Sequence, residues 1–135
     1  MKKIIALIMA PLTLALLPLV ATAQETVLSG TVRGYVAAAT NAPPVVDKDD
    51  PAIGAERAFV VDTGDGYYFL PNVSTARLRQ HATERVRVSG HLDGQRRSIR
   101  VSKIELQRGD QWNQIWSKKE QDRKQAARER RYLQD

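Results

Sequence analysis

The chain has 135 residues, of which 27 % are charged, and a formal net charge of +6. It contains no cysteine, which excludes disulfides, thiolate metal sites, thiol redox chemistry and a cysteine nucleophile. The fold must therefore be held by its own apolar core, in one small domain with at most an appendage.

Residues 1–23 have the layout of a cleavable secretory signal peptide. Two lysines precede an almost entirely apolar run over residues 4–20, and Ala21 and Ala23 provide small side chains at the positions that a signal peptidase reads. We expect cleavage after Ala23 and a mature protein that works in the bacterial periplasm. The alternative is an uncleaved membrane anchor, which two prolines inside the short apolar run weaken as a helix.

The pattern of residues 27–36 predicts a first strand. Leu28, Val32 and Val36 share one face, and Gly30 and Gly34 lie on that same face. Glycines inside a strand indicate a close approach of another backbone, as in the first strand of a small barrel. The Ala-, Pro- and Asp-rich residues 37–55 show no periodicity and predict a long loop.

Three further elements follow this loop. Residues 56–63 predict a second strand, and Gly64-Asp65-Gly66 is a strong hairpin signal that leads into a third strand over residues 67–70. Asn72 or Ser74 can cap a short helix over residues 73–81, with Leu78 turned inward.

Residues 84–92 and 97–106 predict a final hairpin. In the first of these strands the pattern turns Val86, Val88 and Leu92 to the core, and Arg85, Arg87 and Ser89 outward. In the second, the apolar residues change face halfway along the strand. One β-bulge near Ser102 or Lys103 would bring all of them to the core, namely Ile99, Val101, Ile104 and Leu106.

The order of these elements, and the segment from Val86 to Leu92 followed by a turn and by Ile99 to Ile104, resemble small bacterial periplasmic OB-fold proteins. Closure into a barrel also removes the open strand edges that proteins avoid. We therefore predict an all-β fold: a five-stranded OB-like β-barrel over residues 24–109, with a short helix between strands 3 and 4. A charged C-terminal α-helix follows over residues 110–135.

Arginines and tyrosines gather on and near the last predicted hairpin and the first strand. Basic and aromatic side chains on one barrel face are how many OB-folds hold oligonucleotides or anionic sugars. Export favours an oligosaccharide or a lipid headgroup over an oligonucleotide. The alternative is that outward strand positions are simply charged and solvated. The candidate anion-binding residues are Arg33, Tyr35, Tyr68, Arg85, Arg87, Arg97 and Arg100.

Residues 110–134 contain no Gly or Pro and are rich in helix-forming residues, so they predict a helix with Asp110 as its cap. Trp and Arg are favoured at the centres of protein interfaces. The alternatives are that the tryptophans dock onto the barrel, or that the basic end lies on anionic phospholipid headgroups. The candidate partner-binding residues are Trp112, Ile115 and Trp116, spaced as one helical patch, with Lys119 and Arg123.

No set of catalytic or metal-binding groups is recognisable. The acidic loop of Asp47, Asp49 and Asp50 lacks the calcium-loop pattern, and neither His81 nor His91 has a partner at metal-ligand spacing. We therefore expect no catalytic residues, metal or cofactor. The leading hypothesis is a non-enzymatic binding or assembly module that engages a protein partner, or another copy of itself, through residues 110–135. The alternative is an anion binder; nucleic acid is disfavoured and membrane contact is peripheral at most.

Overall fold

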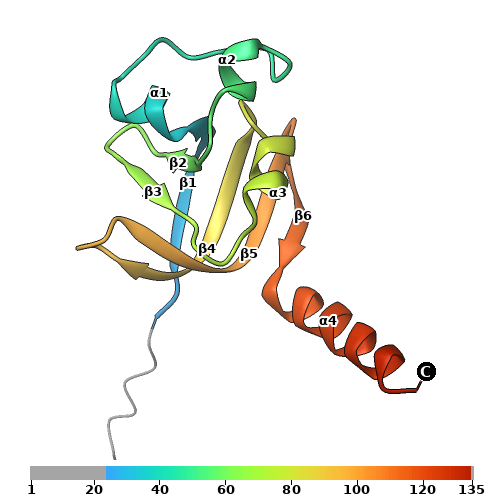
Figure 1. Cartoon of the computed structure of the whole chain (residues 1–135). Coiled ribbons are helices and arrows are strands. Elements are labelled where there is room, and N and C mark those ends of the chain that lie inside the picture. Colours follow the sequence, from blue (N-terminus) through green and yellow to red (C-terminus); the bar gives the residue numbers. More distant parts are fainter. Residues whose placement is uncertain (1–23, 135) are drawn as a thin grey trace, which may run out of the picture.

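The computed structural model describes residues 24–134, so the expected signal peptide lies outside the described residues. Figure 1 shows a β-sheet from which one long helix extends. The sheet has the strand order β3-β2-β1-β4-β5-β6 with antiparallel neighbours. The strands are β1 (Thr26–Gly34), β2 (Phe59–Asp62), β3 (Tyr67–Phe69), β4 (Arg85–Asp93), β5 (Ser98–Arg108) and β6 (Gln111–Ser117). The helices are α1 (Tyr35–Ala39), α2 (Pro51–Gly54), α3 (Thr75–Gln80) and α4 (Lys118–Tyr132).

A short parallel contact joins β3 to β5, in addition to the antiparallel ladder. Phe69 pairs with Ser98, and the backbone N–H of Phe69 donates to the carbonyl of Arg97 at 2.7 Å. Strand β3, at one end of the sheet order, thus also contacts β5, which lies near the other end of that order. The predicted mostly β architecture is confirmed, but the expected number of five strands is wrong, because β6 is a sixth.

The short helix predicted between the third and fourth strands is present as α3. Ser74 is its N-cap, and its hydroxyl oxygen accepts a hydrogen bond from the backbone N–H of Arg77 at 3.2 Å. Leu78 is buried against the sheet, as predicted. The segment 37–55, predicted as a long loop, contains part of α1 and all of α2. It folds because Asp50 caps α2 and Ile53 reaches the core.

The apolar core lies inside the curved sheet. Its fully buried side chains include Val32, Val61, Val86, Val88, Ile99 and Val101. The phase change of β5 is repaired by a β-bulge: Ser89 pairs with Lys103 and Gly90 pairs with Val101, which leaves Ser102 unpaired. Residues on both sides of the bulge are therefore buried, Ile104 and Leu106 included. The predicted bulge near Ser102 or Lys103 is confirmed.

One predicted core position is wrong, and the predicted first strand over residues 27–36 ends two residues earlier than expected. Leu92 is 40 % exposed because β4 continues past the core into the hairpin with β5. Val36 is 59 % exposed because the chain leaves β1 at Gly34 and enters α1. Ser89, which was expected to face outward, is buried next to the bulge, where its carbonyl accepts a hydrogen bond from the hydroxyl of Ser102 at 3.1 Å.

The glycines of β1 stand where other chain segments approach closely, as predicted. A Cβ atom at Gly30 would collide with the backbone carbonyl of Asp62 on β2. A Cβ atom at Gly34 would collide with the side chain of Glu56, whose carboxylate accepts hydrogen bonds from the N–H groups of Val36 and Ala37 at the start of α1.

The predicted helix over residues 110–135 is wrong in its first part. Residues 111–117 pair with β5 as β6, after a turn in which Gly109 has a φ of +60°. Asp110 therefore caps no helix. Ser117 is the N-cap of α4 instead, and its hydroxyl oxygen accepts a hydrogen bond from the N–H of Glu120 at 3.2 Å. The sequence Ser-x-x-Glu at this point has the spacing of a capping box.

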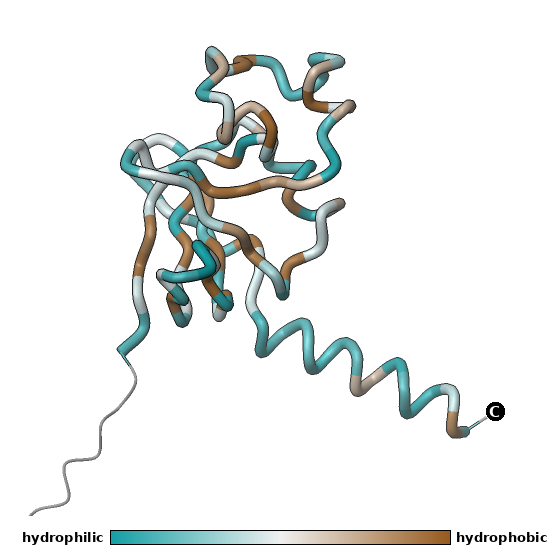
Figure 2. Tube along the Cα trace, turned by 60° about the vertical axis from the view of Figure 1, so that its left-hand side comes forward, coloured by the Kyte–Doolittle hydropathy of each residue, from teal (hydrophilic) through white to brown (hydrophobic). Residues whose placement is uncertain are grey.

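Helix α4 leads away from the sheet (Figure 1). None of its residues is buried, and Figure 2 shows it as hydrophilic along almost all of its length. The fold thus consists of a packed β-sheet domain and a charged helix that meets β5 and β6 at its first turns and then extends away from them.

Candidate functional site

The predicted anion-binding residues do not converge on one site. Arg85 lies at one end of β4, while Arg100 pairs with His91 near the other end. At about 3.4 Å per residue, six residues of strand separate the two ends by about 20 Å. The set therefore divides into separate surroundings.

Arg33 is held in an ion pair on the outer face of β1 and β2. Its Nη1 atom lies 2.8 Å from Oδ2 of Asp62, and its Nη2 atom donates to the carbonyl of Ala42 at 2.6 Å. Burial raises the pKa of Asp62, but the N–H of Gly64 and the guanidinium of Arg33 outweigh burial and lower the pKa below its ordinary value. Arg33 thus attaches the segment after α1 to the sheet, and the positive charge of Arg33 is already neutralised by Asp62.

Arg87 is engaged in the same way on the outer face of β4. Its Nε and Nη2 atoms donate to the two carboxylate oxygens of Glu105 at 3.1 and 2.9 Å, and its guanidinium lies 4.6 Å from the centre of the Trp112 ring. The hydrogen bond from Arg87 is the largest cause that lowers the pKa of Glu105. This forked geometry is typical of a strong structural pair. Arg87 therefore holds β4, β5 and β6 together, and its guanidinium is not free to bind a ligand.

An aromatic cluster covers β3. The ring centroids of Tyr35 and Phe69 are 5.1 Å apart, and Tyr67 lies 5.8 Å from Tyr35 and 6.0 Å from Phe69. The guanidinium of Arg97 lies 5.4 Å from the centroid of Tyr67. Tyr68 pairs with the core residue Val61 and lies apart from this cluster, because adjacent residues of a strand point to opposite faces.

A groove of about 530 Å³ lies between β3 and the β4–β5 hairpin. We name it the hairpin groove. Of the predicted anion-binding residues, Arg100 alone lines it. His91 and Arg96 were not among the predicted ligand-binding residues, and Leu92 was predicted to face the core. The lining residues are Phe69, Pro71, His91, Leu92, Asp93, Arg96, Ser98 and Arg100.

The predicted partner-binding residues are also divided. Trp116 is only 8 % exposed and belongs to the core, Ile115 packs against the core, and Trp112 lies under Arg87 on the outer face. The predicted helical patch of Trp112, Ile115 and Trp116 is wrong, because these residues form β6. Lys119 and Arg123 do lie together on α4.

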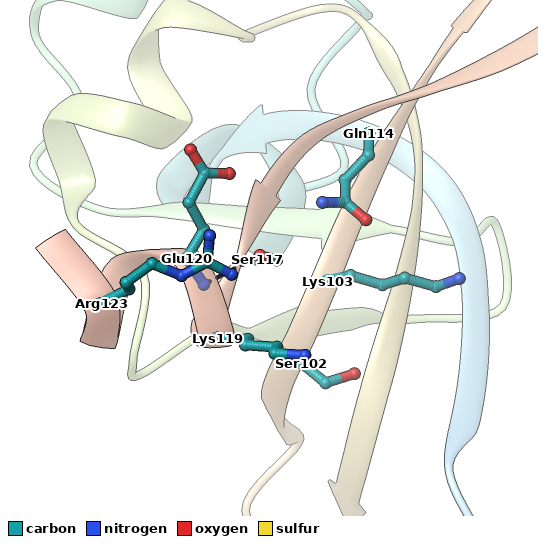
Figure 3. A pocket seen from close by; sticks show the side chains of 7 residues that line it. All are labelled: Ser102, Lys103, Gln114, Ser117, Lys119, Glu120 and Arg123. Atoms are coloured by element: carbon teal, nitrogen blue, oxygen red, sulfur yellow. Dashed lines mark hydrogen bonds between the residues drawn. The ribbon is translucent and has the colours of Figure 1, made fainter.

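Lys119 and Arg123 line a second, shallow groove of about 400 Å³ where α4 leaves the sheet. We name it the α4 groove; Figure 3 shows it from close by. Its wall combines β5, β6 and the first turns of α4. Sequence reasoning missed its strand residues, although the phase change in β5 pointed to Ser102. The lining residues are Ser102, Lys103, Gln114, Ser117, Lys119, Glu120 and Arg123.

The acidic side chains of α4 are all engaged along the helix. Lys118 pairs with Asp122 at 2.6 Å, Lys124 pairs with Glu120 at 3.1 Å, and Gln125 donates to Glu129 at 3.2 Å. Over residues 24–134, neither Lys119 nor Arg123 makes an ion pair within 4.0 Å. Lys119 and Arg123 of the α4 groove are thus available to an external anion.

Three of the residues considered for metal binding have local hydrogen-bond partners. Asp47 accepts a hydrogen bond from the N–H of Asp49, Asp50 caps α2, and Nδ1 of His81 lies 3.0 Å from a carboxylate oxygen of Glu84. In the part of the chain that the structure describes, no three His, Cys, Asp or Glu side chains gather to hold a metal ion.

Across residues 24–134, no helix has the length and the apolar composition needed to cross a membrane. Comparisons with protein-family models, with curated proteins and with solved structures found no match to this chain. Within residues 24–134, Arg100 of the hairpin groove and Lys119 and Arg123 of the α4 groove make no ion pair within 4.0 Å, whereas Arg96 lies 3.7 Å from Asp93.

Proposed function

We propose that this chain is an exported, non-enzymatic binding module in which a β-sheet domain presents α4 to a protein partner. One observation carries this proposal: α4 has 15 residues, none of them buried, and it extends away from the sheet (Figure 1). An isolated helix of this length is only marginally stable in water. A charged helix that buries no residue and extends from its own domain is best explained as a contact surface for another molecule.

The domain itself is proposed to be an OB-like barrel. In that fold the first strand continues into a closed path of five strands, with a helix between the third and fourth. The contact of Phe69 with Ser98 supports this assignment, because it joins β3 to β5 while β4 pairs with β1 on the other side. In this arrangement β6 and α4 are an extension added after the fifth strand.

Truncation of α4 tests the proposed function. A chain that ends at Ser117 keeps all six strands, and because α4 buries no residue we expect its melting temperature to stay within about 4 °C of the full chain. In size-exclusion chromatography of native periplasmic extracts, the full chain is expected to elute in a complex and the truncated chain alone. Unchanged co-elution after truncation would exclude α4 as the contact.

A second candidate function is the binding of an anionic oligosaccharide in the hairpin groove. The groove combines the apolar surface of Phe69 and Leu92 with the guanidinium groups of Arg96 and Arg100. Binding sites for small ligands are typically apolar concavities with a few placed polar groups.

Two double variants with the same charge change test this candidate. Replacing Arg96 and Arg100 by Ser should weaken the binding of a uronic-acid oligosaccharide, measured by calorimetry. Replacing the exposed Arg57 and Arg108 by Ser, outside the groove, should not. Equal affinity of the two variants would exclude the hairpin groove.

A further inference from the structure

Two β-bulges border the α4 groove. Ser102 is the unpaired residue of β5, and Ile115 is the unpaired residue of β6, because Ile104 pairs with Trp116 and Glu105 pairs with Gln114. A bulge bends its strand and turns side chains to new directions, and bulges are common next to functional sites. Here they place Ser102 and Gln114 on the wall of one concave surface, beside the start of α4.

The α4 groove is predominantly positive. Lys119 and Arg123 are unpaired within the described chain, and Lys103 lies 3.7 Å from Glu105, whose carboxylate is already held by Arg87. The single acidic lining residue, Glu120, pairs with Lys124. In Figure 3 the side chain of Lys119 reaches from α4 toward Ser102, whereas the carboxylate of Glu120 points away from both.

The stability of α4 does not explain why a lysine occupies position 119. Lysines in the first turn of a helix face the positive end of the helix dipole, where cations are unfavourable. Lys118 is compensated by Asp122 at 2.6 Å, but Lys119 has no such partner over residues 24–134. Lys119, Arg123 and Arg130 follow one side of the helix, since residues four and seven apart share a face. The basic side is continuous with the groove.

We propose that the α4 groove and the basic side of α4 are the docking site for an acidic segment of the protein partner. The carboxylates of that segment would pair with Lys119 and Arg123, and Gln114 can donate a hydrogen bond to it. This inference rests on the proposed function and specifies that the contacting segment of the partner is acidic. A membrane surface fits less well, because a helix that lies on a bilayer needs an apolar face, and α4 has none.

A charge-reversal pair tests the docking site. The double variant K119E/R123E is compared with R128E/R131E, which makes the same change of charge away from the basic side of α4. The protein recovered from the periplasm is titrated into a fluorescently labelled oligoglutamate peptide, and anisotropy gives the affinity. We expect K119E/R123E to weaken binding about tenfold or more, as the loss of two ion pairs implies. R128E/R131E should change it about twofold.

Three outcomes would overturn the inference. Equal weakening by the two variants would mean that only the net charge of α4 matters. Tighter binding to vesicles rich in phosphatidylglycerol than to the peptide would assign the surface to a membrane. Absence of peptide binding by the full chain would exclude an acidic segment as the ligand of this site. Circular dichroism of both variants checks that α4 remains helical.

The same variants separate this inference from the proposed function. If truncation of α4 abolishes the native complex while K119E/R123E retains it, the docking site is wrong and the role of α4 stands. If the truncated chain retains the complex, the proposed function itself is wrong. Loss of the complex in K119E/R123E but not in R128E/R131E supports both.

Discussion

The two tryptophans of β6 have opposite surroundings, and their replacement by alanine should have unequal effects. Trp116 is 8 % exposed and packs in the core, whereas Trp112 is half-buried beneath Arg87. Removing a buried Trp costs about 3–5 kcal/mol, because the lost burial and the cavity add. Trp112 already meets water on one side, so Trp112→Ala should cost less than about 2 kcal/mol.

These costs translate into melting temperatures. For a domain of this size, 1 kcal/mol corresponds to about 4 °C. Trp116→Ala should therefore lower the melting temperature by about 12–20 °C, and Trp112→Ala by less than about 8 °C. The stability of the whole domain is about 6–16 kcal/mol, so both variants should still fold at 25 °C.

Circular dichroism measures both transitions, and fluorescence adds a second readout. The chain has two tryptophans, so each variant keeps one. Trp112→Ala leaves the buried Trp116 and should emit at shorter wavelength than Trp116→Ala. Equal costs and equal emission maxima would refute the assignment of residues 111–117 to a strand, since a solvated helical patch would treat both rings alike.

Three further predictions concern the sheet and the helix cap. Gly30→Ala should cost about 1–3 kcal/mol in urea unfolding, because its Cβ atom meets the carbonyl of Asp62, whereas Gly54→Ala, with open space around it, should be neutral or slightly stabilising. Asp62→Asn should remove the ion pair with Arg33 and cost about 1 kcal/mol at neutral pH. Folding lowers the pKa of Asp62, so the stabilisation by Asp62 is present above the ordinary pKa of Asp and is lost as the pH falls through the folded pKa. The difference in melting temperature between the native chain and Asp62→Asn should therefore shrink below about pH 4. A difference that stays constant with pH would contradict this. Ser117→Ala should cost α4 about 1 kcal/mol and reduce helical ellipticity, without changing the unfolding of the sheet.

The local features of the fold could be predicted from the sequence. The alternation of apolar residues located the first five strands, and the phase change in β5 located the bulge at Ser102. Ser74 was among the capping candidates for the helix that precedes β4. These features depend on neighbouring residues alone, so periodicity and turn chemistry carry them.

The final strand could not be predicted in the same way. Trp112 and Trp116 are four residues apart, a spacing that one side of a helix and one face of a strand both allow. The bulge at Ile115 then moves Trp116 to the core and leaves Trp112 outside, which hides the pattern of a strand. Helix propensity favoured the wrong assignment, because the pairing of β6 with β5 is a tertiary interaction that overrides it.

The candidate site depended on long-range pairing. Arg33 meets Asp62, 29 residues away, and Arg87 meets Glu105, 18 residues away. Composition shows that arginines are present, but only strand register decides which of them are already neutralised. The unpaired charges of the two grooves emerge only after this register is known.

Photo-crosslinking in living cells tests most directly the central claim that α4 extends from the sheet and contacts a partner. A photoreactive amino acid replaces Ala127, an exposed residue of α4. In a matched control it replaces Val46, which is 92 % exposed in the segment between α1 and α2. Irradiation should give a discrete adduct of higher mass from position 127 and none from position 46. Only monomer from position 127, or the same adducts from both positions, would contradict the account.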